Sequence, residues 1–174
     1  STKTAYINQL LKVGFDTIDF GSFVSPKAIP QLKDTAQVLA GLDLSITKSK
    51  LLSIIANTRG AETACNFDEI NYLGFPLSVS EKFQKRNTNK SIEQALKTVE
   101  EIQNLLINNN KELVVYLSMS FGNPYAENYH PDIVAELTEK LDNIEVGIVA
   151  LSDTVGMSNS ENITPLFSTL IKEF

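Results

Sequence analysis

Hydrophobic residues recur with the period of a helix in some segments of the chain and form short continuous runs in others. Residues 4–13 carry an apolar stripe that fits one helical face, and Gly14 then supplies a helix stop. Ser91 and Gln94 have the spacing of a capping box and mark the start of the clearest helix. Further helices are predicted by the same criteria, which gives helices over residues 4–13, 32–42, 58–67, 91–108, 131–141 and 160–172.

Five apolar runs of strand length lie between these helices, over residues 15–20, 51–56, 69–77, 113–119 and 144–151. Strands of a parallel sheet are covered on both faces and are therefore apolar almost throughout. Such strands in alternation with helices predict an α/β fold, either an open doubly wound sheet or a barrel. No Gly-x-Gly-x-x-Gly sequence follows a strand, which counts against a dinucleotide-binding sheet.

Composition adds limits on the class of protein. The 174 residues are 43% hydrophobic and 21% charged, close to globular averages, and no repeat or linker interrupts them, so we expect one domain over residues 1–174. No apolar run reaches the roughly 18 residues of a membrane helix, so no membrane partner is expected. A net charge of −6 argues against general binding to nucleic acid. One cysteine and one histidine exclude a disulfide framework and a histidine-rich metal cluster within this stretch.

Polar residues gather directly after three of the predicted strands. These groups are Gly21-Ser22, Ser118-Met119-Ser120 and Ser152-Asp153-Thr154. Both barrels and doubly wound sheets bind their ligands at the carboxyl ends of the strands. The sequence therefore predicts a ligand site built from these segments.

A basic segment, which we interpret as a loop, stands apart in this acidic chain. Lys82, Lys85, Arg86 and Lys90 place four cations within nine residues. Such a cluster is suited to the phosphates of a polyanionic ligand, although charge alone also fits a solvated surface loop.

Three segments together resemble hydroxymethylglutaryl-CoA lyases. They are DFGSFVSPKAIPQ at residues 19–31, FQKRNTNKSIEQ at residues 83–94 and LSDTVG at residues 151–156. The Ser-Phe-Val-Ser-Pro-Lys and Arg-Asn-x-Asn-x-Ser-Ile-Glu elements are specific to that family. The Asp-Thr-x-Gly element is shared with relatives that run Claisen-type condensations. The resemblance continues in register along nearly the whole chain.

The resemblance implies a partial TIM (β/α)8 barrel, because a complete one needs eight strands and about 250 residues. On this register the family's first strand precedes Ser1 and its last two strands follow Phe174. The family's metal ligands, which are an Asp, two His and an Asn, also fall outside, as does its catalytic Cys. We therefore expect no metal ligand within this chain.

The resemblance further implies cleavage of 3-hydroxy-3-methylglutaryl-CoA to acetyl-CoA and acetoacetate, a step of leucine degradation. A divalent metal, Mg²⁺ or Mn²⁺, serves as the Lewis acid in the full-length protein, while the fragment alone is expected to be inactive. The expected partner is an acyl-CoA, with a homodimer as one option for assembly. A bacterial source would imply a cytoplasmic location. A mitochondrial location stays open, because Ser1 need not be the native start.

Candidate site residues follow from the same register. Asp19 stands where the family has a Glu near the reaction centre, or else it pairs with an Arg outside the chain. Ser22 is expected to contact substrate, with a turn cap as the alternative. Asp153 and Thr154 are expected to hold the substrate's carboxylate region or to orient metal ligands, unless they only cap a loop or helix. Tyr116 either reaches the barrel mouth or is a core aromatic.

The basic segment gives the expected CoA contacts: Arg86, Asn87 and Ser91, the last two at a helix N-terminus. Two positions depart from the common pattern of the family. Ala150 replaces a frequent Ser and Ser152 replaces a Gly, which leaves fine specificity open.

Two rival functions remain. A condensing acyltransferase of the isopropylmalate or citramalate synthase kind uses the same metal and enolate chemistry, but the Ser-Phe-Val-Ser-Pro-Lys element disfavours it. A non-catalytic barrel fragment is the second rival, because the expected metal ligands lie outside the chain.

Overall fold

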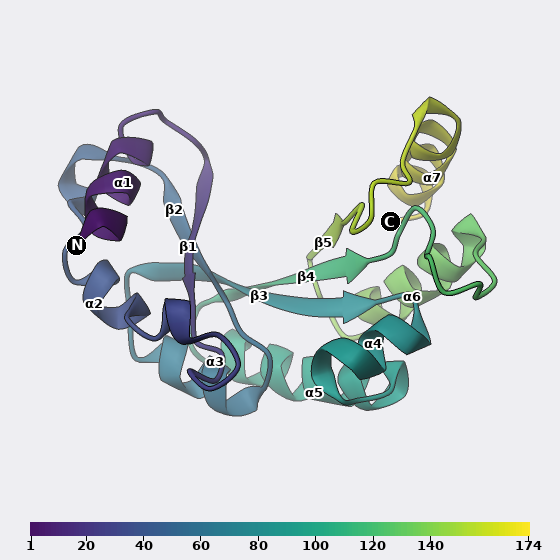
Figure 1. Ribbon diagram of the computed structural model, residues 1–174, viewed down its shortest axis with the longest axis horizontal. Helices are drawn as coiled ribbons and strands as arrows, with labels where there is room; N and C mark the ends of the chain where they lie inside the picture. The colour runs from purple at the N-terminus through teal and green to yellow at the C-terminus, as the bar shows by residue number, and fades with distance from the viewer. The chain divides into compact units, whose positions relative to one another are not determined.

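The computed structural model describes residues 1–174 and contains one sheet whose strands follow chain order, β1-β2-β3-β4-β5 (Figure 1). Pairing is parallel between β1 and β2, between β2 and β3, and between β4 and β5. A doubly wound sheet would reverse its strand order at a switch point, whereas strands in a barrel follow one another around the axis. The prediction of a partial (β/α)8 barrel is therefore confirmed.

The strands are β1 (Thr17–Ser22), β2 (Lys50–Ile54), β3 (Ile70–Ser78), β4 (Glu112–Ser118) and β5 (Ile148–Leu151). The helices are α1 (Thr2–Leu10), α2 (Thr35–Leu39), α3 (Thr58–Cys65), α4 (Glu81–Thr88), α5 (Ile92–Ile107), α6 (Pro131–Asp142) and α7 (Ser160–Glu173), with short 3-10 turns η1 (Pro30–Leu32) and η2 (Leu44–Ile46). None of the helices is both long and apolar enough to cross a membrane.

The chain divides into two compact units. Unit 1 comprises residues 1–74 and 104–112, and unit 2 comprises residues 75–103 and 113–174. The expectation of a single domain over residues 1–174 stays a prediction.

Unit 1 holds β1, β2 and the first part of β3. Its core is built from buried aliphatic side chains, including those of Leu11, Leu51, Ile70 and Leu73. The register between β1 and β2 shifts between Asp19 and Gly21. A Cβ atom on Gly21 would lie 2.6 Å from the Thr35 side chain, so glycine allows α2 to approach the strand at this point. This close approach shapes the end of β1, where the first candidate residues lie.

Unit 2 holds the end of β3 together with β4 and β5. Phe75, Leu77, Leu117 and Leu141 are among its fully buried side chains. The imidazole of His130 accepts a hydrogen bond from the Asp132 amide at 3.3 Å and caps α6. His130 therefore has a structural role at the start of this helix.

Two predicted elements need correction. The basic segment is not a loop, because residues 81–88 form α4, which begins at the N-cap Ser80 and ends at Asn89 in a left-handed conformation with φ 56°. The last strand begins at Ile148 instead of residue 144. The amide of Val146 donates back to the Leu141 carbonyl at 3.0 Å, so the residues in between complete the end of α6.

Candidate functional site

Asp19 lies in β1 between two buried residues, Ile18 and Phe20. Its carboxylate borders a depression of about 330 Å³ whose walls are mostly apolar, lined by Asp19, Phe20, Gly21, Ser22, Ile29, Leu32 and Ile54. Desolvation by these atoms raises the pKa of Asp19 to about 6, although the residue itself is exposed. The Gly21 amide donates to the carboxylate and acts in the opposite direction, lowering the pKa. A carboxyl group whose pKa lies this close to neutrality is suited to give or take a proton.

Ser22 ends β1 and is 4% exposed. Its hydroxyl donates to the carbonyl of Ile54 at 3.1 Å and accepts from the amide of Val24 at 3.2 Å. The amide of Ser22 donates to the Thr35 hydroxyl at 3.0 Å. These contacts join the ends of β1 and β2 and match the predicted turn cap. Contact with a substrate stays a prediction.

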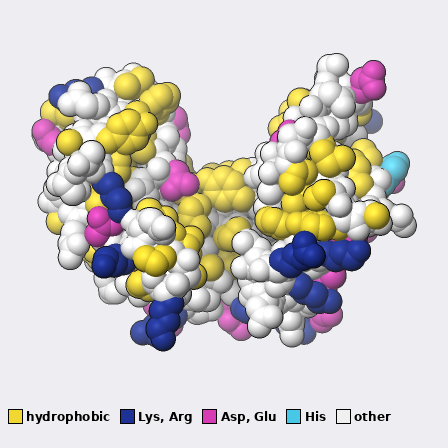
Figure 2. Space-filling model, in the orientation of Figure 1, with side chains coloured by type: hydrophobic (Ala, Val, Ile, Leu, Met, Phe, Trp, Pro, Cys, Tyr) yellow, Lys and Arg dark blue, Asp and Glu magenta, His cyan; other side chains and the backbone are white.

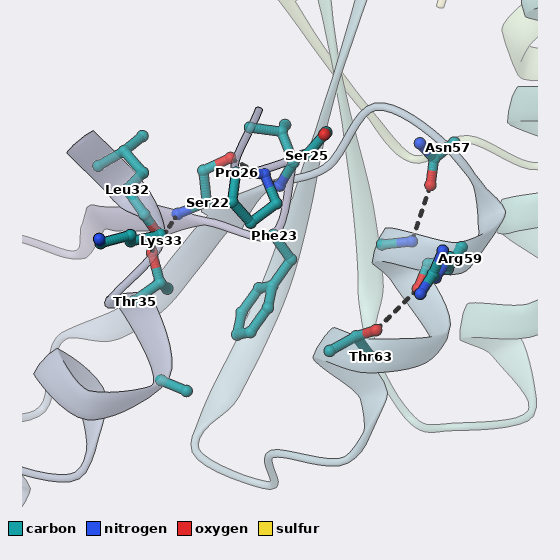
Figure 3. A pocket seen from close by; sticks show the side chains of 13 residues that line it. Ser22, Phe23, Ser25, Pro26, Leu32, Lys33, Thr35, Asn57, Arg59 and Thr63 are labelled. Atoms are coloured by element: carbon teal, nitrogen blue, oxygen red, sulfur yellow. Dashed lines mark hydrogen bonds between the residues drawn. The ribbon is translucent and has the colours of Figure 1, made fainter. Parts of the chain in front are cut away.

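A cavity of about 460 Å³ opens beside Ser22, between the segment after β1 and helices α2 and α3 (Figure 3). Figure 3 shows the Phe23 ring between the α2 side, with Lys33, and the α3 side, with Arg59 and Thr63. No ion pair is formed by Lys33 or Arg59. Sequence reasoning missed both cations. The one available signal was that Arg59 lies just after the carboxyl end of β2.

Asp153 follows β5 and is exposed. Its carboxylate accepts hydrogen bonds from the Ser158 hydroxyl at 2.7 Å, the Ser158 amide at 3.0 Å and the Met157 amide at 2.8 Å. These donors, with the Ser158 hydroxyl foremost, hold the pKa of Asp153 below its ordinary value. The side chain therefore stays anionic and closes the segment that leads to α7.

Thr154 connects the segments that follow β4 and β5. Its hydroxyl oxygen accepts from the Met119 amide at 2.9 Å. The Ser120 amide also donates to the Ser152 carbonyl at 3.3 Å. Two of the three polar strand-end groups found in the sequence are thus in direct contact within unit 2.

Tyr116 is half-buried in β4 and lies opposite Ala150 of β5 in the parallel register. Cross-strand neighbours pack side by side. Tyr116 and Ala150 are therefore neighbours across β4 and β5.

Arg86 and Asn87 are both exposed on α4. Figure 2 shows Lys and Arg side chains, in dark blue, gathered over this helix. Asn87 lies in the last turn of α4, so the expectation that it sits at a helix N-terminus is wrong. The helix was missed because Gln84 is its only buried residue, and no apolar stripe marks it.

Ser91 and Gln94 form the predicted capping box at the start of α5. The Gln94 amide donates to the Ser91 hydroxyl at 3.1 Å, and the Ser91 amide donates to the Gln94 side-chain oxygen at 3.0 Å. The capping-box prediction is confirmed. In this cap the Ser91 hydroxyl oxygen accepts a hydrogen bond. The hydroxyl proton is not used by the cap and can be donated to a ligand.

No group of three His, Cys, Asp or Glu side chains among residues 1–174 could hold a metal ion. Asp19 and Asp153, the two carboxylates of the candidate site, belong to different units. The residues present therefore do not fit a metal site of their own.

The matches to known proteins extend over almost the whole chain. The HMGL-like family model matches residues 1–174. The hydroxymethylglutaryl-CoA lyase YngG of Bacillus subtilis is 32% identical over 174 residues, which are 99% of this chain and 57% of that protein. A mitochondrial hydroxymethylglutaryl-CoA lyase of Macaca fascicularis is 32% identical over 175 residues, covering 98% and 52%. The chain spans about half the length of the curated relatives it matches.

Solved structures give the same result. The crystal structure of the Bacillus subtilis HMG-CoA lyase matches with a TM-score of 0.93 and 31% identity, covering 99% of this chain and 57% of that one. An HMG-CoA lyase from Acinetobacter baumannii, solved in complex with coenzyme A and 3-methylmalate, matches with a TM-score of 0.91 and 29% identity, covering 99% and 55%.

Proposed function

The chain belongs to the HMGL-like family, and from that premise we propose that the whole protein cleaves 3-hydroxy-3-methylglutaryl-CoA to acetyl-CoA and acetoacetate. The observation that carries the proposal is the close structural match, over almost the entire chain, to bacterial HMG-CoA lyases. Candidate residues in or directly after the strands, where barrel enzymes place their chemistry, give it further support.

Asp19 is our candidate for proton transfer. Cleavage of the C2–C3 bond requires a base for the 3-hydroxyl proton, and the enolate of acetyl-CoA then requires an acid. Because the pKa of Asp19 is raised to about 6, both protonation states are populated close to neutral pH. The apolar depression beside it supplies the desolvation that strengthens such a role.

Ser22, Tyr116 and Thr154 are proposed to contact oxygen atoms of the substrate. The Thr154 oxygen accepts from the Met119 amide, so its own proton can be donated to a ligand. The anionic Asp153 would repel a substrate carboxylate. We therefore assign Asp153 to shaping the segment after β5 and to orienting a cation's ligands, which accords with its three accepted hydrogen bonds.

Coenzyme A is proposed to lie with its phosphates against α4, in contact with Arg86, Asn87 and the Ser91 hydroxyl. Residues 81–90 carry four cations and one carboxylate in a chain of net charge −6, so α4 and the residues directly after it are the local counter-charge for a polyanion. The Acinetobacter baumannii relative was solved with coenzyme A bound.

A divalent cation, Mg²⁺ or Mn²⁺, is proposed for the whole protein, with ligands from outside residues 1–174. When bound, it would supply Lewis-acid stabilisation of the substrate's oxygen atoms. The relatives include bacterial, cytoplasmic and mitochondrial lyases. We propose a cytoplasmic location if the source is bacterial, and a mitochondrial location stays open. Assembly as a homodimer stays a prediction.

A product assay separates the proposed lyase from a condensing enzyme. The whole protein is incubated with 3-hydroxy-3-methylglutaryl-CoA and Mg²⁺ or Mn²⁺, and acetoacetate is measured. A parallel reaction contains acetyl-CoA and a 2-oxo acid, and free thiol is measured. The lyase produces acetoacetate in the first reaction, whereas a condensing acyltransferase releases thiol in the second.

A further inference from the structure

We propose that the segment between β4 and α6, residues 119–130, holds α4 in the orientation in which its cations grip the phosphates of coenzyme A. Glu127 and Tyr125 are the positioning residues, and this segment is called the α4 support below. The inference rests on the proposed function, because it assumes that α4 receives the nucleotide end of an acyl-CoA.

Glu127 fixes the first turn of α4. Its carboxylate accepts from the Ser80 hydroxyl and from the Lys82 amide, the latter at 3.1 Å. Ser80 is itself the N-cap of the helix, since its hydroxyl oxygen accepts from the Phe83 amide at 3.1 Å. One carboxylate therefore binds both the cap residue and an otherwise unpaired amide of the first turn. Both ends of this contact belong to unit 2.

The α4 support is braced by its own hydrogen bonds. The Asn123 side-chain oxygen accepts from the amides of Tyr125 at 3.0 Å and Glu127 at 3.2 Å, while its nitrogen donates to the Glu127 carbonyl at 3.1 Å. The Tyr129 hydroxyl donates to the Ser120 carbonyl at 2.6 Å. Glu127 therefore acts from a segment whose backbone is fixed at several points.

Tyr125 meets the cations of α4 directly. The Arg86 guanidinium carbon lies 5.0 Å from the centre of the Tyr125 ring, and the Lys82 ammonium donates to the Tyr125 carbonyl at 3.0 Å. A cation over an aromatic ring is held in orientation without being neutralised. By contrast, Lys85 is paired with Glu81 at 3.0 Å, which offsets its charge.

Arg86 thus keeps its full charge and its N–H donors while its side chain is restrained. A restrained cation loses less conformational freedom when a phosphate binds, so the support increases affinity without touching the ligand. The gain applies only to ligands that carry phosphates. Removing the support should therefore weaken coenzyme A but leave a phosphate-free pantetheine unaffected.

The test measures dissociation constants of the whole protein for coenzyme A and for pantetheine by calorimetry. Tyr125→Leu removes the ring face, and Tyr125→Phe is its matched control because it keeps that face. Glu127→Gln keeps the size of the side chain and removes its charge. Lys97→Ala, at an exposed cation on α5, controls for loss of charge elsewhere in unit 2. Arg86→Ala tests the phosphate contact itself.

We expect Tyr125→Leu and Glu127→Gln each to weaken coenzyme A about threefold to tenfold, with pantetheine unchanged and with Tyr125→Phe and Lys97→Ala like the wild type. Glu127→Gln is a sharp discriminator. If Glu127 were only a nearby negative charge, its removal would tighten binding of an anion. Tighter coenzyme A binding by this variant would overturn the inference.

Two further outcomes also overturn it: unchanged coenzyme A binding by Tyr125→Leu, and equal weakening of coenzyme A and pantetheine, which would show a general structural effect. Arg86→Ala separates this failure from failure of the proposed function. If Arg86→Ala weakens coenzyme A and Tyr125→Leu does not, the inference alone is wrong. If Arg86→Ala has no effect, the inference and the proposed placement of coenzyme A on α4 are both wrong. If the wild type does not bind coenzyme A, the proposed function fails as well.

Discussion

The folded protein spends free energy to hold a charged carboxylate at Asp19, and among single side chains this is the clearest pointer to a function. Burial raises its pKa to about 6, so the folded protein disfavours the charged form that water would favour at neutral pH. A strand residue without a functional role could replace this carboxylate with an amide or a hydroxyl at no such cost. Perturbed acids of this kind concentrate at functional sites.

The free-energy cost of the Asp19 carboxylate depends on pH. An acid whose folded pKa is raised binds its proton more tightly when folded. Stability therefore falls as pH rises from the ordinary pKa of 3.8 to about 6, and it stays lower above that. Asp19→Asn should therefore stabilise the protein more at about pH 7.5 than at about pH 4.5, as measured by urea unfolding. Asp68→Asn, at an exposed carboxylate before β3, is the control for loss of a charge. An Asp19→Asn gain that is the same at both pH values would contradict this cause.

Ser53 provides a second prediction at the level of one residue. Its hydroxyl oxygen is buried in β2 without a hydrogen-bond partner. Leaving such a group unpaired is costly, so Ser53→Ala should raise the free energy of unfolding by about 1 kcal/mol. Ser22→Ala is the matched control: it removes a buried hydroxyl with two hydrogen bonds and should lower stability. Denaturant unfolding of both variants checks the difference in sign.

The resemblance to a known family identified more of the candidate site residues than the pattern of hydrophobic and polar positions did. From the sequence, Asp19 was placed in a β-strand and Ser22 directly after it, and the structure has both in β1, which extends to Ser22. The environment that shifts the pKa of Asp19 was out of reach, because it comes from residues such as Ile29 and Ile54 that are distant along the chain. Lys33 and Arg59 were missed for the same reason.

Among the elements, α4 and α5 show when local sequence suffices and when it does not. The start of α5 was predicted because Ser91 and Gln94 are three residues apart and satisfy each other. The first turn of α4 is held instead by Glu127, which is 45 residues from Lys82 along the chain. A helix that depends on such a distant partner and buries only one residue leaves no periodic signal.

The cap of α5 can be separated from its proposed part in coenzyme A binding. Ser91→Ala should lower the free energy of unfolding by about 1 kcal/mol, since the Gln94 amide loses its acceptor. Ser91→Asp keeps an acceptor and should keep stability, but its charge should weaken coenzyme A severalfold by repulsion of the phosphates. Thermal unfolding and calorimetry give the two readouts. Unchanged coenzyme A binding by Ser91→Asp would remove Ser91 from the proposed site.

For the whole molecule, the alternation of helices and strands was enough to predict a parallel α/β fold, because both faces of such strands are buried and read as apolar runs. The choice of a barrel came from the family resemblance, and the strand order β1-β2-β3-β4-β5 agrees with it. The division into two compact units had no signal in the sequence, since no linker or change of composition marks any of the three junctions between them.

The lyase proposal depends on the match to HMG-CoA lyases and on a carboxylate poised near neutral pH. Cleavage of 3-hydroxy-3-methylglutaryl-CoA by the whole protein tests it most directly, with acetoacetate and acetyl-CoA quantified after addition of Mg²⁺ or Mn²⁺. We predict equal amounts of both products, and a loss of at least about tenfold in kcat for Asp19→Asn. Absence of acetoacetate from a folded wild-type protein that binds coenzyme A would contradict the proposal.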